Sequence, residues 1–309
     1  MIRKFFVKIF LLIFISNNCY ASDFSKNIGD QITTVFNIDR TTNIDLPKGN
    51  WKVIEKDIGS LSAFIWKEMG MVLTDGNKLI AGIEIGELSG LTKYQGQVMP
   101  IIEAAVFKPK EGGCIERQHY SFLRYYKKGF NHNCVAVYHL DVQRELYGSD
   151  YDPDRVYSAL LRKWIKKNEI QIPNIMLVSE SSFLSFRVRD RWVVFVIYIS
   201  PEYFDNFKPQ FTQRDTSEFH PDRINRFPEA KQVIEKFINY AANIHENFQD
   251  QLSKSNKSLK IDLSEFIGIQ VNPISNNNIA DEIEKLNSLY KKGIISKEEF
   301  EKAKSKILN

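Results

Sequence analysis

Two cysteines and five histidines are the side chains of this sequence best suited to chemistry. The sequence has three cysteines, and cleavage of the N-terminal segment described below removes Cys19. Cys114 and Cys134 then form an even pair, and in an oxidising compartment such a pair favours a disulfide. The bond would close a loop of about twenty residues and stabilise the fold by roughly 3 kcal/mol. Two buried free thiols are one alternative, and a nucleophilic cysteine paired with His119 or His132 is another.

Segment 201–227 carries the polar side chains most able to bind a small ligand, Arg214, His220 and Arg223. Prolines interrupt this segment and aromatic residues are spread through it, so we expect it to fold back onto the domain as a packed lid. Contact with a ligand and disorder are the alternatives. A pocket beneath the segment would indicate an exported small-molecule-binding or hydrolytic domain, whereas a filled apolar underside would favour an interaction protein.

Known catalytic patterns are missing from the sequence. It has no Gly-x-Ser-x-Gly elbow, no His-Glu-x-x-His pair, no phosphate-binding glycine loop and no Cys-x-x-Cys motif. The histidines show no metal-ligand spacing, although strand pairing would create a site if it brought His119 and His139 together. We therefore assign no catalytic residue, no metal and no cofactor, and we favour a protein that is not an enzyme.

Residues 1–21 have the pattern of a secretory signal peptide. Arg3, Lys4 and Lys8 precede the apolar run 9–15, and Cys19-Tyr20-Ala21 offers small residues before a cleavage point. The apolar run is far shorter than the ~20 residues that a membrane span needs. The sequence thus predicts cleavage near Ala21, a periplasmic or secreted location, and no transmembrane segment in the mature protein.

The charge of the chain is nearly balanced. Residues 1–21 contain three basic residues and no acidic ones, so their removal lowers the net charge from +4 to +1. A domain this close to neutrality has no electrostatic reason to bind nucleic acid. Hydrophobic residues make up 43% of the sequence, which is enough for residues 22–252 to bury a core of their own.

Residues 22–252 read as an α+β domain, an antiparallel sheet packed with helices. Asp75-Gly76-Asn77 predicts a tight hairpin between two strand segments. Segment 192–200 is apolar on both faces and rich in β-branched and aromatic residues, so we expect it to be the central strand. The predicted strands cover residues 51–55, 61–74, 78–86, 98–107, 114–125, 134–141, 183–188 and 192–200.

Two helices are expected to cover this sheet, at residues 153–168 and about 228–252. The first presents an apolar stripe that includes Trp164, opposite a basic, solvated face. The second presents a wide stripe from Val233 to Phe248, and His245 borders it as a packed residue rather than a ligand. Residues 253–278 then turn to Ser, Asn and Lys, which predicts a tether, interrupted by a short strand or docking segment within 259–271.

Residues 279–309 predict two short helices that form a hairpin. Gly293 ends the first helix, because glycine enters the left-handed conformation of a helix end without steric cost. Ser296 and Glu299 form a capping box that begins the second helix. A segment of this size has too little core to fold alone, so its apolar faces need a partner surface on another copy, on its own domain or on another protein.

This tail resembles the SHOCT (short C-terminal) domain of bacteria. The residues that carry the resemblance are Leu286, Leu289, Gly293, Ile295, Ser296, Glu298, Glu299, Phe300, Lys304 and Leu308. The resemblance covers about a tenth of the chain and implies a helical hairpin that mediates oligomerisation and has no catalytic residues. We therefore expect an exported protein that forms a homo-oligomer through Ile283, Leu286, Leu289, Tyr290, Gly293, Ile295, Ser296, Phe300, Ile307 and Leu308.

Overall fold

The computed structural model divides the chain into two compact units, residues 1–268 and 269–309, and each is described by itself. The predicted signal peptide and Cys114 lie outside the residues that the structure describes. The described residues are 22–39, 42–61, 64–89, 118–128, 131–148, 156–185, 191–211, 213–253, 259–262, 287, 290–291 and 296–308.

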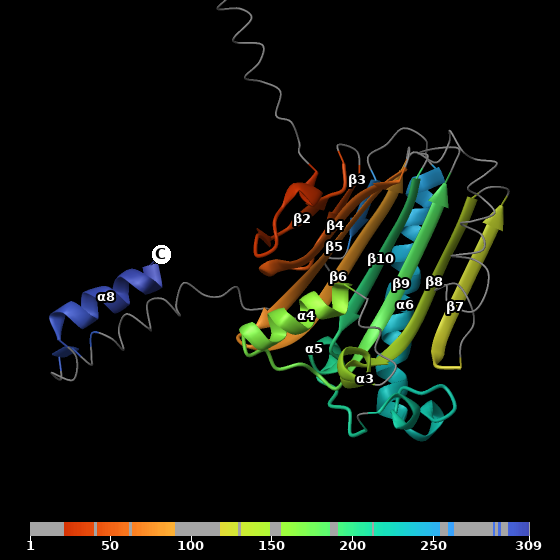
Figure 1. Cartoon of the computed structure of the whole chain (residues 1–309). Helices are drawn as coiled ribbons and strands as arrows, with labels where there is room; N and C mark the ends of the chain where they lie inside the picture. Colours follow the sequence, from red (N-terminus) through yellow and green to blue (C-terminus); the bar gives the residue numbers. More distant parts are fainter. Residues whose placement is uncertain are drawn as a thin grey trace, which may run out of the picture. The chain divides into compact units, whose positions relative to one another are not determined.

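An antiparallel sheet forms the centre of the first unit, as the sequence predicts, and it contains eight described strands, of which β1 was not predicted (Figure 1). The order of its strands is β1-β4-β5-β6-β10-β9-β8-β7. Their bounds, in that order, are Gln31–Ile32, Trp51–Leu61, Phe64–Asp75, Lys78–Ser89, Arg191–Ile199, Ile175–Ser185, Asn131–Asp141 and Tyr120–Lys128. The further strand expected at 98–107 falls outside the described residues.

The hairpin between β5 and β6 is confirmed at the predicted turn. Asp75 pairs with Lys78, and Gly76 between them has a φ of +56°. Glycine takes this left-handed conformation without the clash that a Cβ would cause, which is why an Asp-Gly-Asn sequence closes a two-residue turn so readily. The turn sets the register of the first pairs, Asp75–Lys78 and Thr74–Leu79, and a one-residue shift between Leu73 and Thr74 sets that of the rest of the β5–β6 ladder.

β10 occupies the predicted central position, between β6 and β9. Its odd-numbered side chains Val193, Phe195 and Ile197 are each only 1% exposed. Its even-numbered side chains, including Val196 and Tyr198, are half-buried. The strand is therefore fully covered on one face and only partly covered on the other, a difference between the faces that its uniformly apolar sequence does not reveal.

The fully covered face packs against the long helix α6 (Pro228–Ser253), which lies behind the sheet in Figure 1. Phe248 of this helix is fully buried, and its ring centroid lies 4.0 Å from that of Phe183 and 6.0 Å from that of Phe195. His245 is buried as well, stacked 4.5 Å from Phe183, as a packed residue should be. The wide apolar stripe predicted for this helix thus faces the sheet.

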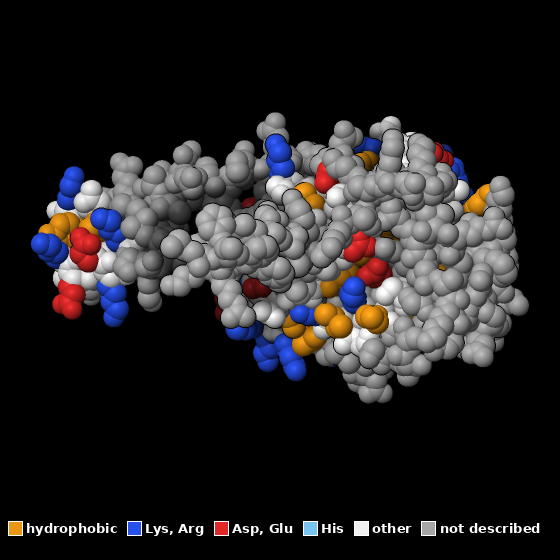
Figure 2. Space-filling model, turned by 90° about the horizontal axis from the view of Figure 1, so that it is seen from above, with side chains coloured by type: hydrophobic (Ala, Val, Ile, Leu, Met, Phe, Trp, Pro, Cys, Tyr) orange, Lys and Arg blue, Asp and Glu red, His pale blue; other side chains and the backbone are white. Residues whose placement is uncertain are grey.

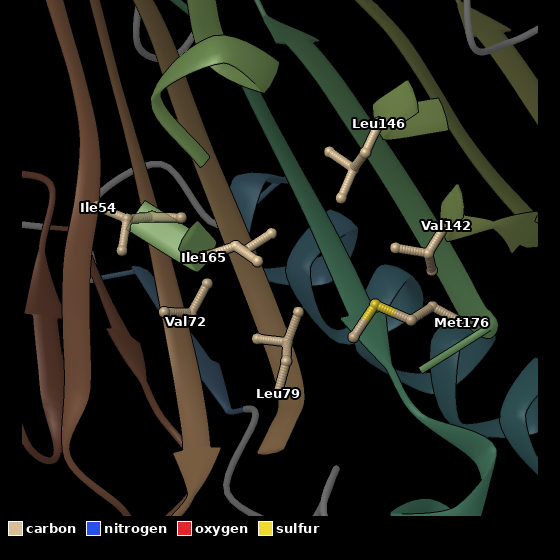
Figure 3. Close-up of a cluster of buried hydrophobic side chains, with 7 residues drawn as sticks. All are labelled: Ile54, Val72, Leu79, Val142, Leu146, Ile165 and Met176. Carbon is tan, nitrogen blue, oxygen red and sulfur yellow. The ribbon is translucent and has the colours of Figure 1, made fainter. Parts of the chain in front are cut away.

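Two shorter helices, α3 (Val142–Tyr147) and α4 (Val156–Lys167), pack on one end of the opposite face. The Asp141 carboxylate begins α3 by accepting a hydrogen bond from the Arg144 amide, 3.0 Å away. Figure 3 shows the side chains that join these helices to the sheet. This cluster consists of Ile54, Val72, Leu79, Val142, Leu146, Ile165 and Met176.

A small second sheet joins the two ends of the first unit. It contains β2 (Val35–Asn37), β3 (Thr42–Asp45) and β11 (Leu259–Asp262), in the order β11-β3-β2. β11 runs parallel to β3, so chain segments more than two hundred residues apart pair directly. The strand expected to interrupt the tether is therefore present at 259–262, and it docks on the N-terminal part of the domain.

The second unit contains α8 (Lys297–Leu308). Helical residues also occur at 287 and 290–291, within the first predicted helix of the hairpin. The rings of Tyr290 and Phe300 stack with their centroids 5.5 Å apart, which is a contact between the two predicted helices. Gly293 and the remaining apolar residues of the turn lie outside the described part of the chain.

Candidate functional site

The loop segment 201–227 is packed onto the domain. It contains the short helix α5 (Pro201–Asp205) and two 3₁₀ turns, η4 (Arg214–Thr216) and η5 (Ile224–Arg226). Phe219 is fully buried and its ring lies 5.3 Å from that of Phe207. Phe204 packs edge-on against Phe237 of α6 at 5.5 Å. Aromatic side chains therefore pack beneath the described part of the segment.

The three loop residues predicted as ligand contacts have neighbours both in the loop and on β8. The Arg214 carbonyl accepts a hydrogen bond from Nε2 of His139, 2.9 Å away. The His220 ring lies 6.1 Å from the His139 ring. The Arg223 guanidinium stacks 5.0 Å from Phe211 and also donates to the Thr216 carbonyl. His139 thus gathers Arg214 and His220, whereas Arg223 is directed to an aromatic neighbour.

His139 attaches this loop to β8. The side chain is fully buried, and burial lowers its pKa from 6.5 to about 4. Because Nε2 donates to a carbonyl, the neutral ring leaves Nδ1 as the acceptor, and no group in the described structure hydrogen-bonds to it. His119 does not join His139, since its ring lies 5.7 Å from Tyr138, whose side chain projects from the other face of β8.

A row of glutamates crosses the half-buried face of the main sheet. The register pairs Glu55 of β4 with Gly70 of β5, and Gly70 with Glu84 of β6. Glu84 pairs with Val196 of β10, and Val196 pairs with Glu180 of β9. Residues that pair directly across neighbouring strands project from the same face of a sheet. Glu55, Glu84 and Glu180 therefore form one line, which we call the carboxyl row.

Glu55 is the most unusual member of the carboxyl row. Its side chain is only 4% exposed, and its Oε1 atom has no hydrogen-bond partner in the described structure. Burial, together with the negative charges of Glu84, Glu68 and Asp57, raises its pKa from 4.5 to about 9. At neutral pH Glu55 is therefore a protonated carboxylic acid.

A glycine makes room for this carboxyl group. A Cβ built on Gly70 would lie 3.1 Å from Oε2 of Glu55, so the carboxyl group lies over the glycine, on the side where Glu84 follows in the row. Tyr198 similarly lies over Gly82, at 3.5 Å from a Cβ built there. The Tyr198 hydroxyl donates a hydrogen bond to Glu84. The row thus has an aromatic border with a hydroxyl group pointing at its central carboxylate.

The sequence shows each of these glutamates but not their alignment. Glu55, Glu84 and Glu180 each follow or interrupt a strongly apolar strand. A glutamate within such a strand is a signal of a functional site, because a carboxyl group is rarely placed on a buried face. The three residues come from strands that are far apart in the chain. Only the strand order β4-β5-β6-β10-β9 brings them into one row.

The described surface that Figure 2 presents has a mixed character. Figure 2 shows acidic and basic side chains interspersed with hydrophobic ones over the described part of the face that it presents. Within that described part of the chain, no three His, Cys, Asp or Glu side chains converge as metal ligands do. None of the described helices combines the length and the apolar character that crossing a membrane requires.

Comparison with known proteins gives one match. Residues 281–308 match the family described as SHOCT, short C-terminal domain. No curated protein and no solved structure matches the chain. The resemblance of the tail is therefore confirmed: residues 281–308 of this chain are a SHOCT domain.

Proposed function

We propose that this is an exported interaction protein whose SHOCT domain joins copies of the chain and so presents several sheet domains together. The match at residues 281–308 is the observation that carries this proposal. The filled underside of segment 201–227 supports it, because Phe219 and its aromatic neighbours occupy the place where the competing hypothesis needs a ligand pocket.

The packing of the tail supports self-association on physical grounds. Tyr290 and Phe300 stack on each other, yet the Tyr290 side chain remains 38% exposed. A two-helix segment buries too little apolar surface to offset the entropy of ordering about thirty residues. A second copy supplies the missing surface, and a homo-oligomer is the simplest closed arrangement of identical faces.

Removing the tail is expected to convert an oligomer into a folded monomer. Light scattering on the mature protein should show an oligomer, and deletion of residues 279–309 should give a monomer with unchanged circular dichroism per sheet domain. The pair Leu289→Asp with Phe300→Asp should have the same effect, because each change buries an unpaired charge at the interface. Glu301→Lys, at an exposed position of α8, is the matched control and should stay oligomeric. A full-length protein that is monomeric at micromolar concentrations contradicts the proposal.

The export part of the proposal concerns maturation and the cysteine pair. Cleavage after Ala21 leaves Cys114 and Cys134 in an oxidising compartment. Cys134 is buried in β8, where it pairs with Ser182 of β9. A bond from this position would attach Cys114 to β8, the strand next to the edge strand β7, and it would stabilise the fold by roughly 3 kcal/mol.

Peptide mapping of the protein purified from its native compartment tests both points at once. We expect an N-terminus at Ser22 and a cross-linked peptide pair that contains Cys114 and Cys134 under non-reducing conditions. Reduction before alkylation should release the two peptides, which is the internal control. Retention of Met1 would exclude cleavage, and quantitative alkylation of both thiols without reduction would exclude the disulfide.

Small-molecule binding by the sheet domain is a second candidate function. The observation that favours it is the carboxyl row, where the buried Glu55 has an unpaired oxygen atom, and not the segment 201–227. The two functions are compatible, because the row lies in the first unit and the SHOCT domain in the second.

A further inference from the structure

The buried glutamates of the described structure differ in the ion-pair and hydrogen-bond partners of their carboxyl groups. Glu87 forms an ion pair with Lys67, with 3.3 Å between Oε2 and Nζ. Glu218 accepts a hydrogen bond from the Gln210 amide at 2.6 Å. Glu55 is buried to the same degree, but its Oε1 atom has no partner. An unpaired buried carboxyl oxygen destabilises the fold and calls for an explanation, and perturbed carboxyl groups of this kind cluster at functional sites.

The acidic neighbours of Glu55 favour a positively charged ligand. Glu84 and Glu68 face Glu55 from β6 and β5, and Asp57 follows it on β4. All three add negative potential at the Glu55 carboxyl group. A cation placed there would ionise Glu55 and gain attraction from the neighbouring acids, whereas a neutral or anionic ligand would gain nothing from them.

The spacing of the row indicates the shape of the ligand. Neighbouring strands lie about 4.8 Å apart, so Glu55 and Glu84, two strands apart, are separated by roughly 10 Å at the backbone, and the same holds for Glu84 and Glu180. A calcium or magnesium ion needs its oxygen ligands within about 2.6 Å of one point. Three carboxyl groups spread along such a line cannot all reach one ion, but they can bind an extended chain that carries several charges.

The border of the row suits an aliphatic amine. Val196 lies in the row between Glu84 and Glu180, and Tyr198 comes from the next position on the same face of β10. Val196 offers an apolar surface to methylene groups, and a tyrosine ring attracts an ammonium group at its face. The Tyr198 hydroxyl holds Glu84 in place by donating to it.

We propose that the carboxyl row binds a linear polyamine, with one ammonium group between Glu55 and Glu84, methylene groups over Val196, and a further ammonium group at Glu180. This proposal goes beyond self-association and does not depend on it. Because Glu55 is protonated at neutral pH in the protein alone, binding displaces a proton. Affinity therefore rises with pH between neutrality and about pH 9, over the range in which the ligand itself stays charged.

Calorimetric titration of the full-length protein with spermidine tests the proposal. We expect saturable binding at about pH 8, and a difference in enthalpy between buffers of different ionisation heat that reports proton release. Glu55→Gln should weaken binding roughly tenfold or more and abolish the proton release, since one charge-assisted hydrogen bond is lost. Glu229→Gln, which removes an exposed charge from the first turn of α6, is the matched control and should bind as the parent does.

Further ligands and variants distinguish polyamine binding from the binding of a single ammonium group or of a calcium ion. n-Butylamine, which has one ammonium group, should bind at least about tenfold more weakly than spermidine. Glu180→Gln should weaken spermidine and leave n-butylamine unchanged, and it provides a second variant if Glu55→Gln alters the fold. Displacement of spermidine by an equal concentration of calcium chloride would overturn the proposal. So would equal losses of affinity in Glu55→Gln and Glu229→Gln, or no heat of binding at millimolar spermidine.

Discussion

The free energy of unfolding is expected to be greatest near pH 6.5 and to fall by about 1.4 kcal/mol per pH unit on either side. Three buried groups set this profile, Glu55, His139 and His245. Each has a pKa in the folded protein that differs by units from its value in an unfolded chain, so each binds protons unequally in the two states.

The alkaline side of the profile is due to Glu55. An unfolded chain releases this proton near pH 4.5, whereas the folded protein keeps it up to about pH 9. Between these values the folded state binds one more proton, so stability falls as the pH rises. The contribution is fully present below pH 4.5 and is lost as the pH rises through about 9.

The acid side is due to the two histidines. Burial lowers the pKa of His139 from 6.5 to about 4, and burial together with the nearby positive charge of Arg124 lowers that of His245 to about 4 as well. Between these values the unfolded chain binds two more protons, so stability falls as the pH falls. The stability that these neutral rings contribute is fully present above pH 6.5 and is lost toward pH 4. Over the same pH range the folded state binds one more proton at Glu55. The unfolded chain therefore binds a net excess of about one proton.

Denaturant unfolding at a series of pH values separates the three groups. Glu55→Gln should flatten the alkaline side and make the acid side about twice as steep, because the opposing proton is gone. His245→Gln should flatten the acid side alone. Glu229→Gln should leave the profile unchanged. An unchanged alkaline slope in Glu55→Gln would show that Glu55 is already ionised at neutral pH in the folded protein.

Phe248→Ala is expected to lower the free energy of unfolding by about 3–5 kcal/mol. The ring is fully buried between α6 and the sheet, in contact with Phe183 and Phe195, and its removal leaves a cavity that the surrounding aromatic rings cannot fill. Typical domains have only about 5–15 kcal/mol of stability, so this single change would remove a large part of it. Urea unfolding followed by circular dichroism at the pH of maximum stability measures the loss.

Two comparisons identify the cause of that loss. Phe248→Leu keeps most of the apolar volume and should cost less than about 1.5 kcal/mol. Phe211→Ala removes the same ring at a position of the loop where the side chain is 36% exposed. This change should also cost less than about 1.5 kcal/mol. A loss in Phe248→Ala no larger than in Phe211→Ala would mean that α6 does not pack on the sheet through this ring.

Features that depend on neighbouring residues could be predicted from the sequence alone. The turn at Asp75-Gly76-Asn77 is specified by its own residues, because glycine permits the left-handed conformation there. The central position of β10 and the packed face of α6 follow from the density and period of apolar residues. The SHOCT domain was identified in the same way, from Gly293 and the capping residues around Ser296.

The carboxyl row, by contrast, was decided by the tertiary structure. Alternation tells which face of a strand a glutamate occupies, but it does not tell which strands are neighbours or in which register they pair. β6 and β10 are adjacent although more than a hundred residues separate them, and this pairing places Glu84 in line with Glu180. The parallel pairing of β11 with β3 and the contact of His139 with Arg214 have the same origin. Each is a contact between distant segments, which the chain makes only when apolar faces from its whole length are buried together.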